Sequence, residues 1–125
     1  MSNSKLIESF KVGTTLSAQR IVYMSAANTV AYLNTVTSLP VGVTIDTVDD
    51  TTQAIPVQEN GKAHILFNDT VAAGGLVTAD SNGRGVPFSA VTAATAYIGV
   101  LVGEAVAATG TIAEVLINPG FQNIP

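Results

Sequence analysis

The stretch AGGLVTADSNGRGVPFSA, residues 73–90, decides the fold, because it holds two short apolar runs separated by a turn. Both runs, GLVTA and GVPF, are rich in residues that favour strands. Between them lies Asn82–Gly83, a dipeptide typical of tight hairpins. A weaker copy of the pattern, AQRIVYMSAANTVAYLN, occupies residues 18–34. The chain therefore predicts the same strand–turn–strand unit twice.

Short apolar runs bounded by turn residues continue along the chain and predict nine strands. Pro56 and Pro87 lie inside two of them, which predicts edge strands or bulges there. Only residues 89–96, SAVTAATA, favour a helical turn. The predicted fold is mainly β: a small compact barrel or sandwich built from two similar strand–turn–strand halves, with an extended N-terminal arm. The nine runs are RIVYM, TVAYL, VGVTI, AIPVQ, AHILF, GLVTA, GVPF, YIGVLVG and TIAEVLI.

The two halves align with each other, residues 16–57 with residues 71–114. The offset grows from 55 to 57, and each step falls in a loop, where insertions are tolerated. This predicts an internal duplication, and the alternative is the chance similarity of any Val-rich β chain. The matched pairs are Leu16–Val71, Ile21–Leu76, Val22–Val77, Val30–Val86, Tyr32–Phe88, Gly42–Gly99, Val43–Val100, Ile45–Val102 and Ile55–Ile112.

Three glycines are predicted to have structural roles. Gly42 and Gly99 occupy equivalent positions, which predicts a close approach of the backbone or a bulge in both halves. Gly83 belongs to the hairpin turn described above, and Asn60–Gly61 predicts a second hairpin of the same kind.

Composition favours an assembly component. The 125 residues fit one domain, and 47% of them are hydrophobic. Charged residues make up 11%, against roughly 25% in ordinary soluble domains, which suits a surface covered by neighbours. The sequence has no cysteine, and hence no disulfide or thiolate metal site. No apolar run approaches the roughly 18 residues of a membrane span, so no membrane partner is expected.

The charges are unevenly distributed. The first twenty residues hold Lys5, Lys11 and Arg20 against Glu8, a formal +2, and the remainder holds two basic residues against eight acidic ones, a formal −6. A basic leading segment on an acidic body suits an arm that docks on an acidic surface, and chance clustering is the alternative. A nucleic-acid partner is not expected, because the body has the wrong sign.

No constellation of residues predicts catalysis. The single histidine, His64, lies in an alternating strand without a partner in the sequence. The acidic cluster in residues 46–50 lacks the glycine and final glutamate of a calcium loop, and Gly61–Lys62 lacks the rest of a phosphate loop. Glu104 and Glu114 are interpreted as surface groups. The sequence therefore predicts no enzyme, no metal and no cofactor.

The order of motifs resembles a known family. AAGGLVTADSNGRGVPF, a spacer of small residues and AYIGVLVGEAVAATGTIAEVLINPG are similar to the small capsid decoration, or head cement, proteins of tailed bacteriophages. LPVGVTIDTVDDTTQAIPVQENGKAHILF fits the middle of that family, and the resemblance covers residues 12–118. It implies a barrel that forms homotrimers on the outer surface of the expanded capsid, after synthesis in the host cytoplasm. It also implies that the major capsid protein is the partner and that the head is stabilised against DNA pressure.

The N-terminal segment has two interpretations. As an arm, residues 1–14 add a strand to a capsid sheet, and the contacting residues are Lys5, Leu6, Ile7, Phe10 and Lys11. As the alternative, the same segment is the first strand of the barrel. In either case residues 15–118 are expected to form the β-barrel domain and residues 119–125 a C-terminal tail. The alternative function is a phage surface or tail module that recognises a host glycan.

Overall fold

The chain folds into two stacked five-stranded units. The computed structural model describes residues 6–12, 14–32, 40–80, 82–88 and 96–121. All nine predicted segments form strands, as β2 to β10, so the mainly β fold is confirmed. The helical turn predicted for 89–96 concerns residues 89–95, which lie outside the described ranges. The strands are β1 (Ile7–Val12), β2 (Ile21–Ala26), β3 (Thr29–Ala31), β4 (Gly42–Thr44), β5 (Ile55–Gln58), β6 (Lys62–Leu66), β7 (Leu76–Ala79), β8 (Gly85–Pro87), β9 (Ala96–Leu101) and β10 (Ile112–Phe121).

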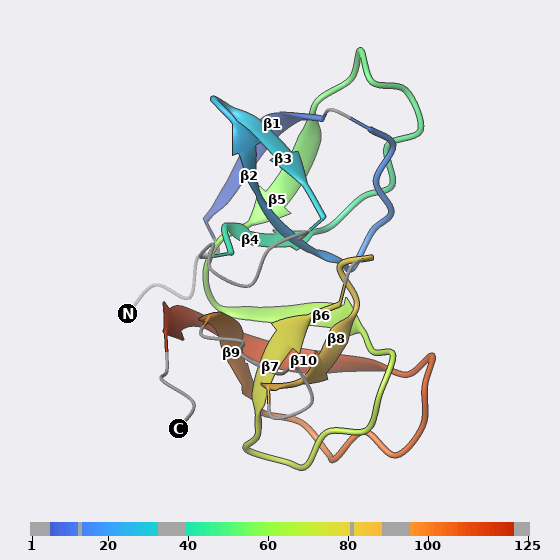
Figure 1. Ribbon diagram of the computed structural model, residues 1–125, viewed down its shortest axis with the longest axis vertical. Helices are drawn as coiled ribbons and strands as arrows, with labels where there is room; N and C mark the ends of the chain where they lie inside the picture. Colours follow the sequence, from blue (N-terminus) through green and yellow to red (C-terminus); the bar gives the residue numbers. More distant parts are fainter. Residues whose placement is uncertain (1–5, 13, 33–39, 81, 89–95, 122–125) are drawn as a thin grey trace.

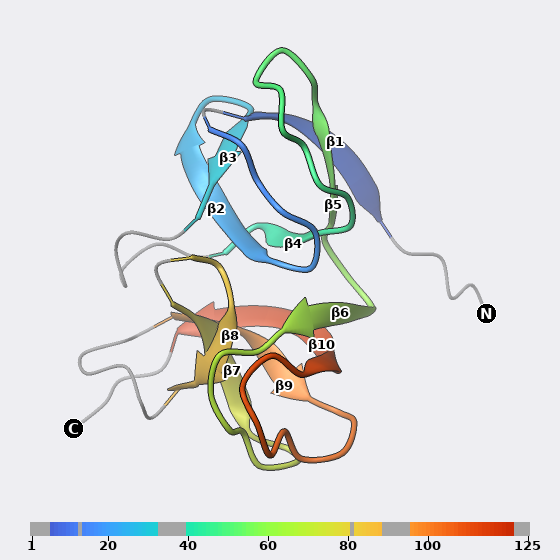
Figure 2. The same cartoon turned by 90° about the vertical axis from the view of Figure 1, so that its right-hand side faces the viewer.

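The N-terminal half closes into a barrel and the C-terminal half forms an open sheet. The barrel has the order β1-β3-β2-β4-β5, and β5 pairs back with β1. The second sheet has the order β6-β10-β9-β7-β8. The two units lie one above the other, with β6 and β8 next to the barrel (Figures 1 and 2). Within the described residues no helix has the length and apolarity to cross a membrane.

Strand β1 closes the barrel. Residues Ile7–Phe10 pair antiparallel with β5, and Lys11 and Val12 pair parallel with Thr29 and Val30 of β3. The structure thus places Ile7–Val12 in the barrel, in accord with the first-strand interpretation of this segment. Its apolar residues Phe10 and Val12 face the barrel interior, where burial stabilises the closing pair.

The strands of the two halves have the same neighbours. We take β6 to β10 as counterparts of β1 to β5. When the closed barrel is read from β1 in the other direction, its order is β1-β5-β4-β2-β3, which matches β6-β10-β9-β7-β8 in the second sheet. The parallel closure between β1 and β3 has its counterpart in a single parallel bridge, Phe67 to Gly85, between the ends of β6 and β8. The second sheet is therefore an incompletely closed version of the barrel.

The correspondence extends to register and backbone conformation. Val22 pairs with Gly42 and Val77 with Gly99, at the matched positions of the sequence alignment. The bridge Leu16–Val48 has its counterpart in Val71–Val106. Positive φ angles recur at the same offset of 55, at Gln19 (63°) and Gly74 (80°), and at Asn28 (55°) and Gly83 (75°). The duplication remains a proposal, and these correspondences support it. The matched pair Ile55–Ile112 is wrong: Gln58 pairs with Val43 as Leu116 pairs with Val100, an offset of 58, so the buried Ile55 does not correspond to Ile112, which is 48% exposed.

Among the described residues, each unit contains an apolar cluster, and the second cluster also includes residues of the barrel. Val12, Leu16, Val22, Val30, Val48, Ile55 and Val57 fill the barrel. The larger cluster fills the second sheet around Phe67 and Ile98, and it includes three residues on the outside of the barrel, Ile21, Tyr23 and Val43. The barrel is therefore packed on the second unit through the outer faces of β2 and β4.

Backbone hydrogen bonds fix this packing. The Ile21 amide donates to the Gly83 carbonyl at 2.7 Å, and the Leu66 amide donates to the Gln19 carbonyl at 3.0 Å. Burial raises the pKa of Tyr23 to about 12, and a hydrogen bond to Thr78 lowers it by a smaller amount. These contacts join the start of β2 to both edges of the second sheet.

Two local predictions need correction. Asn60–Gly61 is not a hairpin turn, because β5 and β6 belong to different sheets; with Gly61 at φ 76°, it links the two halves. β5 contains Pro56 but is not an edge strand, because it pairs with β1 on one side and with β4 on the other. On the β4 side, the Pro56 carbonyl accepts a hydrogen bond from the Ile45 amide. Pro87 does lie in an edge strand, β8.

The C-terminal strand is longer than predicted. β10 continues to Phe121, so residues 119–121 of the predicted tail belong to the sheet. The register shifts between Ile117 and Gly120, and pairing with β9 then resumes at Gly120 opposite Tyr97. Pro119 lies at this irregularity, where the lack of an amide donor is tolerated. A bulge therefore lets the strand run past a proline that the sequence pattern treats as its end.

Candidate functional site: an apolar patch beside strand β1

The residues predicted to contact a capsid fall into two groups. Leu6 and Ile7 are exposed, with 49% and 45% of their surface accessible, and Lys11 is also exposed. Phe10 packs against the barrel core, so it is not part of the exposed surface. Lys5 lies outside the described residues. Of the exposed members, Leu6 and Ile7 lie at the start of β1, and Lys11 lies near its end.

Strand register brings further apolar side chains to Ile7. Ile7 lies opposite Gln58 of β5, which places it diagonal to Pro56 on the same face. The Ile45 amide donates to the Pro56 carbonyl at 3.3 Å, and the Ile45 side chain is 41% exposed. We call Leu6, Ile7, Ile45 and Pro56 the β1 patch. Ile7, Ile45 and Pro56 share one face of the strands, and Leu6 lies at the edge of the patch, because its side chain alternates to the other face. The sequence analysis found its first two members and missed the other two, because register across β4, β5 and β1 brings them together.

The edge of the β1 patch is anchored to the linker between the halves. The Leu6 amide donates to Asn60 Oδ1 at 2.6 Å, and the Glu59 amide donates to the Leu6 carbonyl at 2.8 Å. Leu6 thus extends the pairing between β1 and β5 by one residue. The patch is therefore held on paired strands, which suits an interaction surface that must keep its shape.

Two carboxyl groups lie next to the β1 patch. Burial, a hydrogen bond to Glu8 and the negative charge of Glu8 together raise the pKa of Glu59 from 4.5 to about 7. Its Oε2 atom is buried without a hydrogen-bond partner. The sequence analysis missed this pair, since residues 8 and 59 are distant in sequence and meet only through the pairing of β1 with β5.

The raised pKa predicts a stability that falls as the pH rises. Between about pH 4.5 and 7 the folded chain keeps a proton on Glu59 that the unfolded chain has lost. The free energy of unfolding should therefore decrease across this window, and Glu59→Gln should make the decrease smaller. Urea denaturation at several pH values measures this, with Glu104→Gln as an exposed control. A decrease that is equally steep in Glu59→Gln would show that other groups cause it.

The three glycines predicted as structural lie where a side chain has no room. A Cβ atom at Gly42 would collide with the Gln58 carbonyl oxygen, and one at Gly99 would collide with the Leu116 carbonyl oxygen. Gly83 has a φ of 75°, and a Cβ there would lie 2.8 Å from the Ile21 carbonyl oxygen. These positions determine how closely strands β4–β5, β9–β10 and the two halves approach.

The turn between β7 and β8 is organised by Asp80, which the sequence analysis did not identify. Asp80 accepts from the amides of Asn82 and Arg84, both at 2.9 Å, and from Arg84 Nε at 3.0 Å and Asn68 Nδ2 at 3.1 Å. The Asp80 amide donates to the Arg84 carbonyl at 2.9 Å, which leaves three residues in the hairpin loop. The turn presents the Gly83 carbonyl to Ile21, so it serves the packing of the halves.

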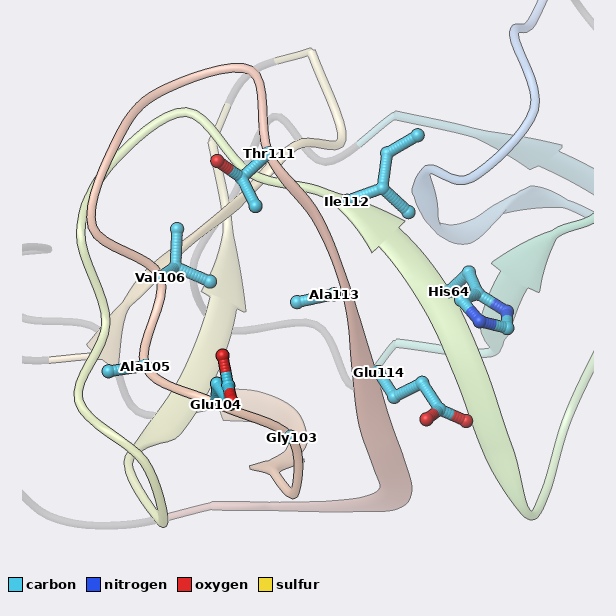
Figure 3. Close-up of a pocket in the computed structure, with 9 residues that line it drawn as sticks. All are labelled: His64, Gly103, Glu104, Ala105, Val106, Thr111, Ile112, Ala113 and Glu114. Carbon is cyan, nitrogen blue, oxygen red and sulfur yellow. The ribbon is translucent and has the colours of Figure 1, made fainter.

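His64 lies beside a cavity of about 380 Å³ in the C-terminal half. His64 of β6 faces Glu114 of β10 on the same side of the sheet, and Glu104 comes from the loop after β9 (Figure 3). Among the described residues no group of three or more His, Cys, Asp or Glu side chains is placed to hold a metal ion. Glu104 and Glu114 are exposed and half-buried respectively.

Comparison with known proteins locates this fold. No protein-family model matches the chain, and no curated protein sequence matches it. Among solved structures, the head fiber gp8.5 N base of bacteriophage phi29 is similar, with a TM-score of 0.69 and 16% sequence identity. The alignment covers 97% of this chain and 100% of that one. The chain therefore has the fold of a head-fiber base, and the capsid decoration proteins that its sequence resembles also belong to phage heads.

Proposed function

We propose that this chain is a structural protein of a phage virion that decorates the outer surface of the head. Its partner is the major capsid protein, it acts as a homotrimer, and it stabilises the expanded head against internal DNA pressure. The proposed role is not enzymatic. The protein is made in the host cytoplasm.

The fold carries this proposal. The full length of a head-fiber base aligns with nearly the full length of this chain, so the shared part is the whole unit and not an isolated hairpin. The resemblance of residues 12–118 to decoration proteins supports the same role from the sequence. A low charged fraction of 11% also suits a protein that is covered by neighbours on a particle.

The β1 patch is the proposed contact with the capsid. It presents Leu6, Ile7 and Ile45 from paired strands, with Lys11 further along β1. Covering half-exposed Leu and Ile side chains contributes about 1 kcal/mol each. Such weak contacts become effective in a trimer, because the second and third contacts form within a molecule that is already bound.

The double variant Leu6→Gln with Ile7→Thr tests this contact. Both side chains point to solvent in the free protein, so the fold should persist, while binding to heads should weaken at least about tenfold. The measurement is co-sedimentation with expanded heads that lack this protein, with bound copies counted at saturation.

Met24→Gln is the matched control, because Met24 is 44% exposed and lies on β2 outside the β1 patch. It should bind as the wild type does. Unchanged binding of the double variant would place the capsid contact elsewhere on the chain. No saturable binding of the wild type to heads would contradict the decoration role itself.

A further inference from the structure

The outer face of the second sheet carries apolar side chains on either side of Glu114. Its side chains are in register: Leu76 of β7 lies opposite Val100 of β9, which lies opposite Leu116 of β10. Leu116 is 42% exposed. Val102, after β9, and Ile112, on β10, lie on the same face and are 42% and 48% exposed. We call Leu76, Val100, Val102, Ile112 and Leu116 the C-face.

The equivalent row of the first sheet is an interface. Ile21, Val43 and Gln58 occupy the positions of Leu76, Val100 and Leu116, with the same register between strands. They are 0%, 1% and 4% exposed. Ile21 and Val43 are covered because the barrel packs on the second unit through this row. In the first sheet, this row of side chains therefore already packs on a second five-stranded unit of the same fold.

At one position the two rows differ in a way that solvent exposure does not explain, because the covered row has the polar residue and the exposed row has the apolar one. The covered position has a glutamine, Gln58, and its Nε2 donates to the carbonyls of Asn60 and Lys62 in the linker, both at 2.8 Å. The exposed position has a leucine, Leu116. A solvated sheet face alternates to polar residues, so an apolar row left in solvent marks a contact surface.

Charge does not oppose contact between two copies at the C-face. The charged and titratable side chains on the same face of β6 and β10 are Lys62, His64 and Glu114. They nearly balance, and Glu114 lies directly opposite His64 (Figure 3). Glu104, on the loop after β9, borders the same face, so a contact at the C-face costs least where these charged groups stay in solvent at its rim.

We infer that the C-face binds a second copy of this chain. We choose a second copy as the partner because the equivalent row of the first sheet packs on a five-stranded unit of the same fold within each chain. A second copy supplies two such units. The inference names the surface for the self-association in the proposed function and rests on that part of it. It does not depend on attachment to a capsid, so it can be tested on the isolated chain.

The test compares sedimentation of the full chain with the double variant Val100→Thr, Leu116→Gln over a wide concentration range. Threonine keeps the shape of valine, and glutamine is the residue that the equivalent position already has. The wild type should associate, and the variant should raise the dissociation constant at least about tenfold. Met24→Gln is the control, because Met24 is exposed to a similar degree, 44%, and lies outside both the C-face and the β1 patch.

Each other outcome overturns the inference in a distinguishable way. If the variant associates as the wild type does, the C-face is not the contact, and self-association through another surface stands. If the wild type is a monomer at every concentration, self-association itself is wrong. If the wild type is monomeric but the variant loses binding to heads, the occupant of the C-face is the capsid. A melting temperature close to that of the wild type shows that the variant is folded.

Discussion

Gly99→Ala and Gly42→Ala are each expected to destabilise the chain by about 3 kcal/mol or more. The added methyl group would collide with a main-chain carbonyl of the facing strand, Leu116 for one and Gln58 for the other. Main chain within a ladder cannot rotate away as a side chain can, so the strands must separate and their hydrogen bonds lengthen. For a domain of this size the loss should lower the melting temperature by about 10 °C.

The chain offers a matched control for both substitutions. Gly103 lies just after β9, and a Cβ atom there would meet no atom within 4 Å. Gly103→Ala should therefore leave stability unchanged or slightly higher, since alanine reduces the entropy of the unfolded chain. Thermal and urea unfolding of the three variants measure the difference. Equal stabilities would show that the sheets can relax around a methyl group at Gly42 and Gly99.

The strands and the repeat were predictable because they depend on local chemistry. Val, Ile, Thr and Tyr runs between turn residues mark nine of the ten strands. The proposed repeat was visible in the sequence because matched positions meet similar constraints: Gly42 and Gly99 both face a main-chain carbonyl. A sequence records such constraints directly, since only glycine satisfies them.

The role of β1 was not predictable from the segment itself. Its alternation of apolar and polar residues suits either an arm that adds to another sheet or a closing strand. The choice depends on pairing with β5 and β3, about 20 to 50 residues away, and no local pattern records it. The same is true of Phe10, which pairing turns towards the barrel core.

Only half of the candidate site was accessible to sequence reasoning. Leu6 and Ile7 were found because the alternation of residues 5–12 suits a segment that adds a strand to another sheet, as the family resemblance implies. Ile45 and Glu59 were missed, since only the register of β4, β5 and β1 brings them next to Ile7 and Glu8. The C-face was hidden for a further reason: Leu76, Val100 and Leu116 have the pattern of an ordinary core strand, and exposure distinguishes them.

Phe67→Ala is expected to cost about 3–5 kcal/mol, because Phe67 is the largest fully buried side chain. Its ring lies against Gly85, with which it forms the one bridge between the ends of β6 and β8. A Cβ atom at Gly85 would lie 2.7 Å from the ring. Gly85→Ala in the wild type should therefore cost about 1–3 kcal/mol by overpacking.

The two substitutions together should reverse the sign of the second. Once Phe67 is alanine, the methyl group at position 85 enters the space that the ring leaves, and it also stiffens the unfolded chain. Gly85→Ala should then raise the free energy of unfolding where it lowered it before. Phe67→Leu, which removes less volume, keeps the cycle measurable if Phe67→Ala does not fold. Urea unfolding measures the four free energies of the cycle. Additive effects would mean that the ring of Phe67 does not determine how closely β6 and β8 approach. Glycine at position 85 would then be required by the backbone of β8 itself.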